Sequence, residues 1–254
     1  WLADRTWFTN PVEVPPRKWI TGRSSELQRH SKSTARAQQA PFLCHWSPFQ
    51  VCSVGTLRLN RLSTRHVGPI ECRVEAAECV CIHGASGSGK TLLLRAIADL
   101  DPHQGEASLD GAGCSTLPPP EWRRSVALVV AESQWCSEHV REHFAHGVNP
   151  AWLERLGLPV AAIDWQVARC STGEKQRLAL LRSLMQGPAV LLLDEPTGNL
   201  DQDSTRRVEA LLDDYRQQQS AALLWVTHDP EQIRRVARRS FALRNGLLEE
   251  DLPR

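Results

Sequence analysis

The sequence has no apolar run that approaches the roughly 20 residues a helix needs to cross a bilayer. Any membrane pore that this 254-residue chain serves must therefore be supplied by another protein. The chain also lacks an excess of charge, because 30 Lys and Arg residues balance 29 Asp and Glu residues and leave a formal net charge of +1. A surface dedicated to nucleic acid is usually strongly basic, so we expect no nucleic-acid partner.

The eight cysteines lack the spacing of a metal site or a disulfide framework. Cys79 and Cys81 lie in an apolar segment that we expect to be a buried strand, and no partner residues stand at a spacing that would complete a metal site with them. We therefore expect the cysteines to be reduced core residues.

The first fifty residues lack the positively charged start, apolar stretch and small-residue cleavage site of a secretory signal. They hold four of the nine tryptophans, interleaved with lysines and arginines, and show no clear helical or strand period. Two interpretations are open: a basic, aromatic arm that contacts membrane headgroups or nucleic acid, or a loosely ordered or misassigned extension. We favour the extension.

Eight consecutive residues match the phosphate-binding loop pattern G-x-x-x-x-G-K-[ST], namely Gly84, Ala85, Ser86, Gly87, Ser88, Gly89, Lys90 and Thr91. Glycines are needed because the backbone N–H groups curl around the phosphates, while Lys90 reaches the β- and γ-phosphates and the Thr91 hydroxyl reaches Mg²⁺. A β-prone run over residues 79–82 precedes the loop, and a helix-forming run over residues 91–100 follows it. The sequence therefore predicts a strand, a loop and a helix that bind ATP with Mg²⁺.

Two carboxylates close another apolar run, residues 190–193. Such an uncharged run is typical of a parallel strand covered on both faces, and ligands of these sheets bind beyond the carboxyl ends of the strands. Adjacent strand residues point in opposite directions, so the two side chains can take different tasks. We predict that Asp194 binds Mg²⁺ and that Glu195 orients and deprotonates the attacking water. The alternative is a strand that merely ends in a solvated acidic turn.

Residues 170–177, C-S-T-G-E-K-Q-R, resemble the signature of the ATP-binding cassette (ABC) ATPases, which is L-S-G-G-Q followed by a basic helix. Ser171 and Gly173 are kept, while Cys170 and Thr172 replace Leu and the first Gly. A small polar residue and a glycine at a helix N-terminus suit an anion, because unpaired N–H groups and the helix dipole favour negative charge there.

Two further segments follow in the order of that family. Residues 197–201 resemble its D-loop, and residues 225–229 resemble its switch-histidine segment. By this resemblance, His228 would hydrogen-bond the γ-phosphate. The resemblance covers about residues 54–250, and this part looks similar to ATPase subunits for metal export, macrolide export and lipoprotein release.

The resemblance implies an α/β fold with a P-loop NTPase core, in which helices flank a mostly parallel sheet. An antiparallel β edge subdomain and a short helical insert at about residues 133–170 complete the expected fold. The same resemblance implies one ABC ATPase domain over residues 54–250, preceded by a poorly determined extension over residues 1–53.

By the same resemblance, ATP would be hydrolysed at the interface of a homodimer or a paired cassette, with ATP and Mg²⁺ as cofactors. Glu195 and His228 would be catalytic, and the dimer would drive an integral membrane permease, a separate chain, from the cytoplasmic face of the inner or plasma membrane. The interface would contain Ser171, Thr172, Gly173, Glu174 and Asp201.

Two departures from the family leave alternatives open. Ala131 occupies the position of a glutamine that usually follows the strand before the insert, and Gln134 could replace that glutamine only with three extra residues. Residues 57–79 hold no aromatic side chain for adenine, so Arg65 or His66 would have to stack on it. The alternatives are a degenerate cassette that binds ATP with little turnover and a soluble ABC-type ATPase that acts on nucleic acid or ribosomes.

Apolar periodicity and turn residues predict the remaining elements. We expect antiparallel strands over residues 57–62 and 72–75, a strand over residues 122–131, and helices over residues 140–144, 151–156 and 204–218. A basic helix is expected over residues 229–239. Its arginines should form a solvated face, or else a lipid-contacting patch; they are Arg234, Arg235, Arg238 and Arg239.

Overall fold

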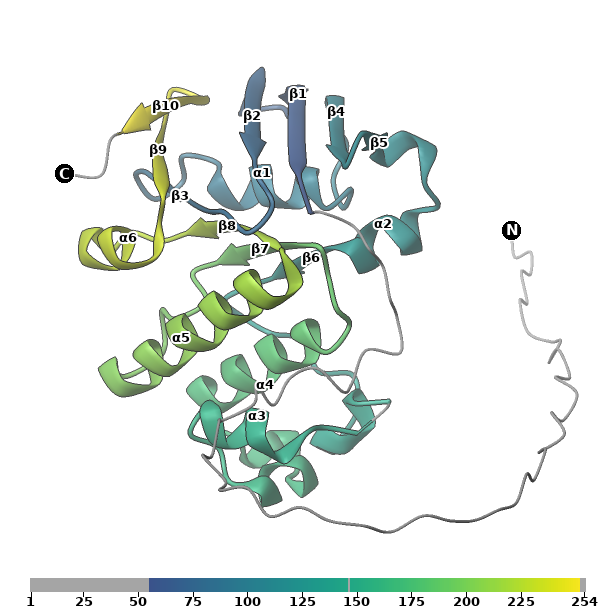
Figure 1. Cartoon of the computed structure of the whole chain (residues 1–254), viewed down its shortest axis with the longest axis vertical. Coiled ribbons are helices and arrows are strands. Elements are labelled where there is room, and N and C mark those ends of the chain that lie inside the picture. The colour runs from purple at the N-terminus through teal and green to yellow at the C-terminus, as the bar shows by residue number, and fades with distance from the viewer. Residues whose placement is uncertain (1–54, 146, 252–254) are drawn as a thin grey trace, which may run out of the picture. The chain divides into compact units, whose positions relative to one another are not determined.

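The described residues form two β-sheets and the helices that cover them (Figure 1). The computed structural model describes residues 55–145 and 147–251. The extension predicted over residues 1–53 lies outside this part of the chain.

The six-stranded sheet is mostly parallel. Its strand order is β10-β9-β3-β8-β7-β6, and β10 runs antiparallel to β9. In chain order the strands are β3 (Cys79–His83), β6 (Val126–Val129), β7 (Val190–Asp194), β8 (Ala222–Val226), β9 (Arg239–Arg244) and β10 (Leu247–Asp251). Every residue of β7 and β8 is buried, which confirms that these apolar runs are strands covered on both faces.

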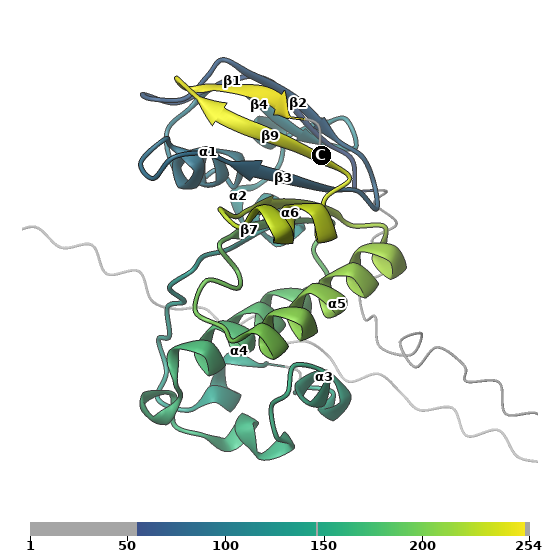
Figure 2. The same ribbon diagram turned by 90° about the vertical axis from the view of Figure 1, so that its left-hand side faces the viewer.

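Alternation along β3 divides the core between the two faces of this sheet. The flanking helices are α1 (Lys90–Ile97), α4 (Thr172–Leu184) and α5 (Gln202–Gln219). Val80 and Ile82 pack with α1 and the second sheet, whereas Cys79 and Cys81 pack with α4 and α5. Figure 2 shows α4 and α5 on one side of β3 and β7, and α1 on the other. Both cysteines are free and buried, which confirms them as core residues, whereas Cys136 is exposed, so the prediction is wrong for that cysteine.

The second sheet is antiparallel, with the strand order β2-β1-β4-β5. Its elements are β1 (Leu57–Ser63), β2 (Ile70–Val74), β4 (Gln104–Leu109) and β5 (Ala112–Gly113), followed by the 3₁₀ turn η1 (Cys114–Thr116). The predicted antiparallel edge strands are confirmed, although β2 begins two residues earlier than expected.

The prediction of a strand over residues 122–131 is wrong in its first part. Residues Pro119–Ser125 form helix α2, and β6 begins only at Val126. Prolines suit the first helical positions, because their missing N–H groups would have no intrahelical partner there. Trp122 is fully buried, and its Nε1 donates to the Ile97 carbonyl oxygen at 2.9 Å. This bond joins α2 to the end of α1 and stabilises the helical conformation.

The helical insert consists largely of single turns. Its elements are η2 (Val140–His143), α3 (Pro150–Arg155), η3 (Val160–Asp164) and η4 (Val167–Arg169). Helix α3 confirms the helix expected over residues 151–156, but the helix expected over residues 140–144 is only a 3₁₀ turn. There the Val140 N–H donates to the Trp165 carbonyl oxygen at 3.0 Å, so the backbone pairs across the insert.

The helix expected over residues 204–218 is confirmed as α5. The basic helix expected over residues 229–239 is confirmed only as α6 (Pro230–Val236), because the chain leaves the helix there and Arg239 begins β9. Two of the four arginines expected on this helix do not form the predicted solvated face. Arg235 Nη2 lies 2.8 Å from Oε1 of Glu209, and Arg239 Nε lies 2.8 Å from Oε1 of Glu78. Because both carboxylates are buried, they attract these cations inward and tie α6 and β9 to the rest of the domain.

Replacing Glu209 with alanine should lower the free energy of unfolding by about 1–3 kcal/mol, because a buried hydrogen-bonding network loses its acceptor. Glu209 accepts from Arg235 and also from Nε2 of buried Gln232 at 2.9 Å. Urea denaturation measures the change. As a control, Glu249→Ala removes an ion pair with Arg244 in which both side chains are more than half exposed, and should change stability by less than about 0.5 kcal/mol. Equal effects of the two substitutions would contradict this assignment.

Candidate functional site

The predicted phosphate loop connects β3 to α1 in a conformation that requires glycine. Gly84, Gly87 and Gly89 have positive φ angles of 151°, 77° and 100°. A Cβ atom on Gly89 would lie 2.3 Å from Cγ2 of Val67, and one on Gly84 would lie 2.8 Å from the Leu243 carbonyl oxygen. The conformation and the close packing of the loop together exclude side chains at these two positions.

Lys90 begins α1 and turns back over the loop. Its Nζ donates to the carbonyl oxygens of Gly84 and Ala85, both at 2.9 Å. The Ser88 hydroxyl oxygen is buried and has no hydrogen-bond partner among the described residues. A curled backbone, an ammonium group and an unpaired hydroxyl before a helix N-terminus fit an anion such as a phosphate.

Thr91 and Asp194 meet next to this loop. The Thr91 hydroxyl donates to Oδ2 of Asp194 at 2.8 Å. Asp194 ends β7 and is buried. Mg²⁺ prefers oxygen ligands and is often bound by one or two protein oxygens together with the phosphates of the substrate. The two side-chain oxygens therefore fit a Mg²⁺ ion.

Glu195 and His228 form a second pair at the same edge of the sheet. Nδ1 of His228 lies 2.9 Å from Oε1 of Glu195. Their strands are parallel neighbours, with Asp194 paired to Val226, so the residues that follow each strand come together. The hydrogen bond to the Glu195 carboxylate, and then its negative charge, raise the pKa of His228 above the ordinary value.

The predicted signature residues begin α4, which lies on the opposite face of the sheet from α1. Ser171 caps the helix: its Oγ accepts from the Glu174 N–H at 3.3 Å, and Oε2 of Glu174 accepts from the Ser171 N–H at 2.8 Å. Ser171 and Thr172 are exposed. Gly173 packs so closely that an added Cβ would lie 3.1 Å from a methyl group of Leu200. The structure thus presents two of these side chains to the outside of the chain.

Asp201 lies in the segment between β7 and α5. It caps α5 by accepting from the Ser204 N–H at 2.9 Å, and this bond, followed by that from the Ser204 hydroxyl, lowers the pKa of Asp201. Thr197 is held at the other end of the segment, because its hydroxyl accepts from Nε2 of Gln232 in α6 at 2.9 Å. Both ends of the predicted D-loop are therefore fixed by side chains.

Gln176 belongs to the site although its sequence context gives little sign of this. It lies between Lys175 and Arg177, a pattern typical of an exposed basic helix face. In the structure its side chain is buried, and Nε2 donates to the Glu195 carbonyl oxygen at 2.9 Å. An uncharged amide between two cations is the only local signal that could have identified it.

The two departures from the family pattern lie close to predicted elements. Ala131 is half-buried and follows β6 by two residues. In the same loop, the Gln134 carbonyl oxygen accepts from the Arg182 guanidinium at 3.2 and 3.3 Å. Arg65 and His66 are exposed in the turn between β1 and β2, which packs against the phosphate loop. Stacking of either side chain on adenine stays a prediction.

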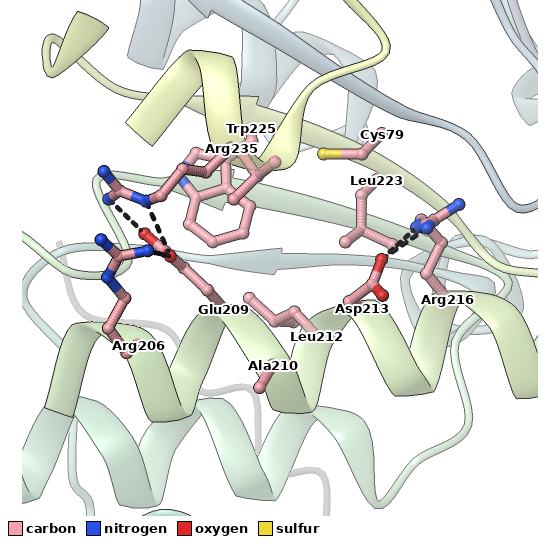
Figure 3. A pocket seen from close by; sticks show the side chains of 11 residues that line it. Cys79, Arg206, Glu209, Ala210, Leu212, Asp213, Arg216, Leu223, Trp225 and Arg235 are labelled. Carbon is pink, nitrogen blue, oxygen red and sulfur yellow. Dashed lines mark hydrogen bonds and ion pairs between the residues drawn. The ribbon is translucent and has the colours of Figure 1, made fainter. Parts of the chain in front are cut away.

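A cavity of about 380 Å³ lies between α5, α6 and the sheet, away from these residues (Figure 3). Its charged side chains pair with each other, Arg235 with Glu209 and Arg216 with Asp213. None of the residues that line the cavity belongs to the phosphate loop, to the Thr91–Asp194 pair or to the Glu195–His228 pair. The cavity is therefore not the nucleotide site.

The parallel sheet, the glycine loop that opens a helix, and the carboxylates at the carboxyl ends of the strands define a P-loop nucleotide-binding protein. The family is more specific. A family model described as "ABC transporter" matches residues 67–198, just over half of the chain. The chain therefore belongs to the ABC transporter family, as an ATP-binding subunit with ATPase activity.

Two relatives illustrate the extent of the match. The chain is 35% identical over 172 residues to a probable iron export ATP-binding protein, FetA, of Escherichia coli K12, covering 63% of this chain and 76% of FetA. It is 32% identical over 227 residues to an aliphatic sulfonates import ATP-binding protein, SsuB, of Pseudomonas fluorescens Pf0-1, covering 85% of this chain and 81% of SsuB. The names thus include both an exporter and an importer.

Solved structures show the same fold. A dimeric ATP-binding cassette in a post-hydrolysis state with ADP and Pi superimposes with a TM-score of 0.68 at 22% identity, covering 78% of this chain and 99% of the other. CbiO1 from Clostridium perfringens, part of the transporter complex cbiONQ, gives a TM-score of 0.66 at 21% identity, covering 78% of this chain and 88% of the other. Among the residues described for this chain, no helix has the length and hydropathy to span a membrane.

The pKa of His228 should lie above the ordinary value of a histidine, as NMR titration of its ring protons would measure. A raised folded-state pKa means that the His228–Glu195 pair stabilises the fold below the unfolded pKa, and that this contribution is lost as the pH rises through the folded pKa. Glu195→Gln should lower the titration midpoint of His228, because a neutral amide replaces the carboxylate. Glu249→Gln, a control far along the chain, should leave it unchanged. An unaltered midpoint in Glu195→Gln would refute the pairing.

Proposed function

We propose that this chain is the ATP-hydrolysing subunit of an ABC transporter, which dimerises on ATP and drives a separate membrane permease from the cytoplasmic face. The observation that carries the proposal is the convergence of Lys90, Thr91, Asp194, Glu195 and His228 at one edge of the parallel sheet. Such an arrangement combines an anion-binding loop, a metal site and a candidate general base.

Mg²⁺ would be held by the Thr91 hydroxyl and the Asp194 carboxylate, whose oxygens are already within 2.8 Å of each other. When bound, the ion supplies positive charge to the phosphate oxygens. Lys90 would exchange its two loop carbonyls for the β- and γ-phosphates. Because the loop itself holds the ammonium group at the start of α1, little rearrangement of the side chain is needed.

Glu195 is the proposed general base. Its carboxylate would accept the proton of a water that attacks the γ-phosphate, while the imidazole of His228 would hydrogen-bond a γ-phosphate oxygen. A hydrogen bond of 2.9 Å joins the two side chains, which supports a role for both at the same phosphate.

The second half of each site would come from a partner copy or a paired cassette. Ser171 and Thr172 are exposed at the start of α4, where helix N–H groups favour an anion. With Gly173 and Glu174 they would close the γ-phosphate site of the partner, and Asp201 would lie at the same interface. A partner is needed because a single loop and helix leave the γ-phosphate open to water on one side.

We also propose that residues 54–250 form a single ABC ATPase domain with the insert at about residues 133–170. The relatives include subunits named for export and for import, so the proposal names neither a direction of transport nor a cargo. A degenerate cassette with little turnover is the second candidate. It is favoured by Ala131 and by Thr172, which replace residues usual in the family.

Lys90→Ala and Glu195→Gln should separate binding from hydrolysis. Lys90→Ala should weaken nucleotide binding, because the loop loses the cation that contacts the phosphates. Glu195→Gln should keep binding but slow turnover by at least about 100-fold, the scale of a lost general base. The measurements are Mg²⁺-ATP turnover and nucleotide affinity, with the mass in solution followed in the same samples.

The expected signature of Glu195→Gln is a dimer that accumulates with ATP. Turnover at the parental rate in this variant would refute Glu195 as the base. Bound ATP with no turnover in either the parent or the variant would favour the degenerate cassette.

A further inference from the structure

Gln176 connects the start of α4 to the proposed general base. It lies five residues after the helix cap Ser171 and has an exposed fraction of only 2%. Its Nε2 donates to the Glu195 carbonyl oxygen at 2.9 Å. A carbonyl oxygen only accepts hydrogen bonds, so the amide nitrogen must face it and the orientation of the amide is determined.

The backbone of Glu195 has a conformation that few side chains adopt. Its φ angle is +48°, in the left-handed region that non-glycine residues seldom occupy. Three hydrogen bonds hold it there: its N–H donates to Val226 at 3.1 Å, and its carbonyl oxygen accepts from Gly198 at 3.1 Å and from Gln176. Such strain persists where the surroundings determine the conformation, and it is common at active sites.

The direction of the Glu195 side chain depends on that backbone conformation. Two of the three bonds come from the strand and turn next to Glu195, whereas the third comes from a side chain of α4. A shift of α4 would therefore be transmitted to the carboxylate that lies 2.9 Å from His228. Gln176 makes this direct connection between the signature helix and the base.

The other half of the amide has unused hydrogen-bonding capacity. Oε1 of Gln176 is buried and has no hydrogen-bond partner among the described residues. A buried acceptor without a partner costs free energy, so this half of the amide is unfavourable for stability. Retaining an amide here is explained by the bond that it makes to Glu195.

We propose that Gln176 is a positioning residue that couples the two nucleotide sites of the dimer. The inference rests on the proposed function, in which α4 of one chain contacts the nucleotide bound by its partner. Nucleotide bound in the partner's site would then set the position of α4. Through its hydrogen bond, Gln176 would move the backbone of Glu195 in the chain's own site along with α4. Coupling of this kind is a differential stabilisation of one arrangement of α4 by the ligand.

The test compares Gln176→Leu with Gln186→Leu, a control at an exposed position just beyond the same helix. Leucine removes the donor but keeps the bulk of the side chain. We expect Gln176→Leu to bind ATP within about threefold of the parent, to lose roughly 10- to 100-fold in kcat through misplacement of the base, and to reduce the Hill coefficient for Mg²⁺-ATP towards 1. Gln186→Leu should behave as the parent does.

NMR titration of His228 supplies a readout that does not depend on turnover. In Gln176→Leu the Glu195 carboxylate should move away, so the midpoint of His228 should fall, as it would not if Gln176 only stabilised the fold. An unchanged midpoint, or a parental kcat and Hill coefficient in Gln176→Leu, would overturn the inference. If the parent is inactive but the titration midpoint of His228 still shifts in Gln176→Leu, the positioning role of Gln176 would stand and the proposed function would be contradicted.

Discussion

The parallel pairing of β3, β7 and β8 is the constraint on which the rest of the structure depends. These strands lie more than 100 residues apart in places, yet their hydrogen-bonded register brings their carboxyl ends to one edge. The phosphate loop, Glu195 and His228 each follow one of these strands, and Asp194 ends β7. In the described part of the chain, this register brings an ammonium group, two carboxylates and an imidazole to the same edge of the sheet.

Several side chains of the site are hydrogen-bonded to other groups of the protein itself. Lys90 donates to loop carbonyls, Thr91 donates to Asp194, and His228 pairs with Glu195. A nucleotide must therefore exchange existing hydrogen bonds for new ones, and its net affinity is the difference between the two sets. Ser171, although it is bonded to Glu174, and Thr172 are exposed at the start of α4 and open to contact from outside the chain. This difference supports the proposal that a partner completes the site.

The sequence predicts most of the site because short motifs encode local chemistry: a glycine loop before a helix, or carboxylates after an apolar strand, need only neighbouring residues. It fails where a contact across the chain decides the conformation. Trp122 is bound into α2 by its hydrogen bond to Ile97, although its neighbours suggested a strand. Arg235 points to buried Glu209, and Gln176 reaches Glu195, because of packing between elements that no local pattern records.

The most direct measurement of the central claim is complementation between two inactive variants. Lys90→Ala disables the phosphate loop, and Thr172→Asp places a negative charge at the exposed start of α4, where a helix N-terminus tolerates it but a γ-phosphate would not. Each variant alone should be inactive. An equal mixture should recover ATP turnover, because one site of the mixed dimer then combines an intact loop with an intact signature. A mixture that forms dimers but stays inactive would contradict the composite site.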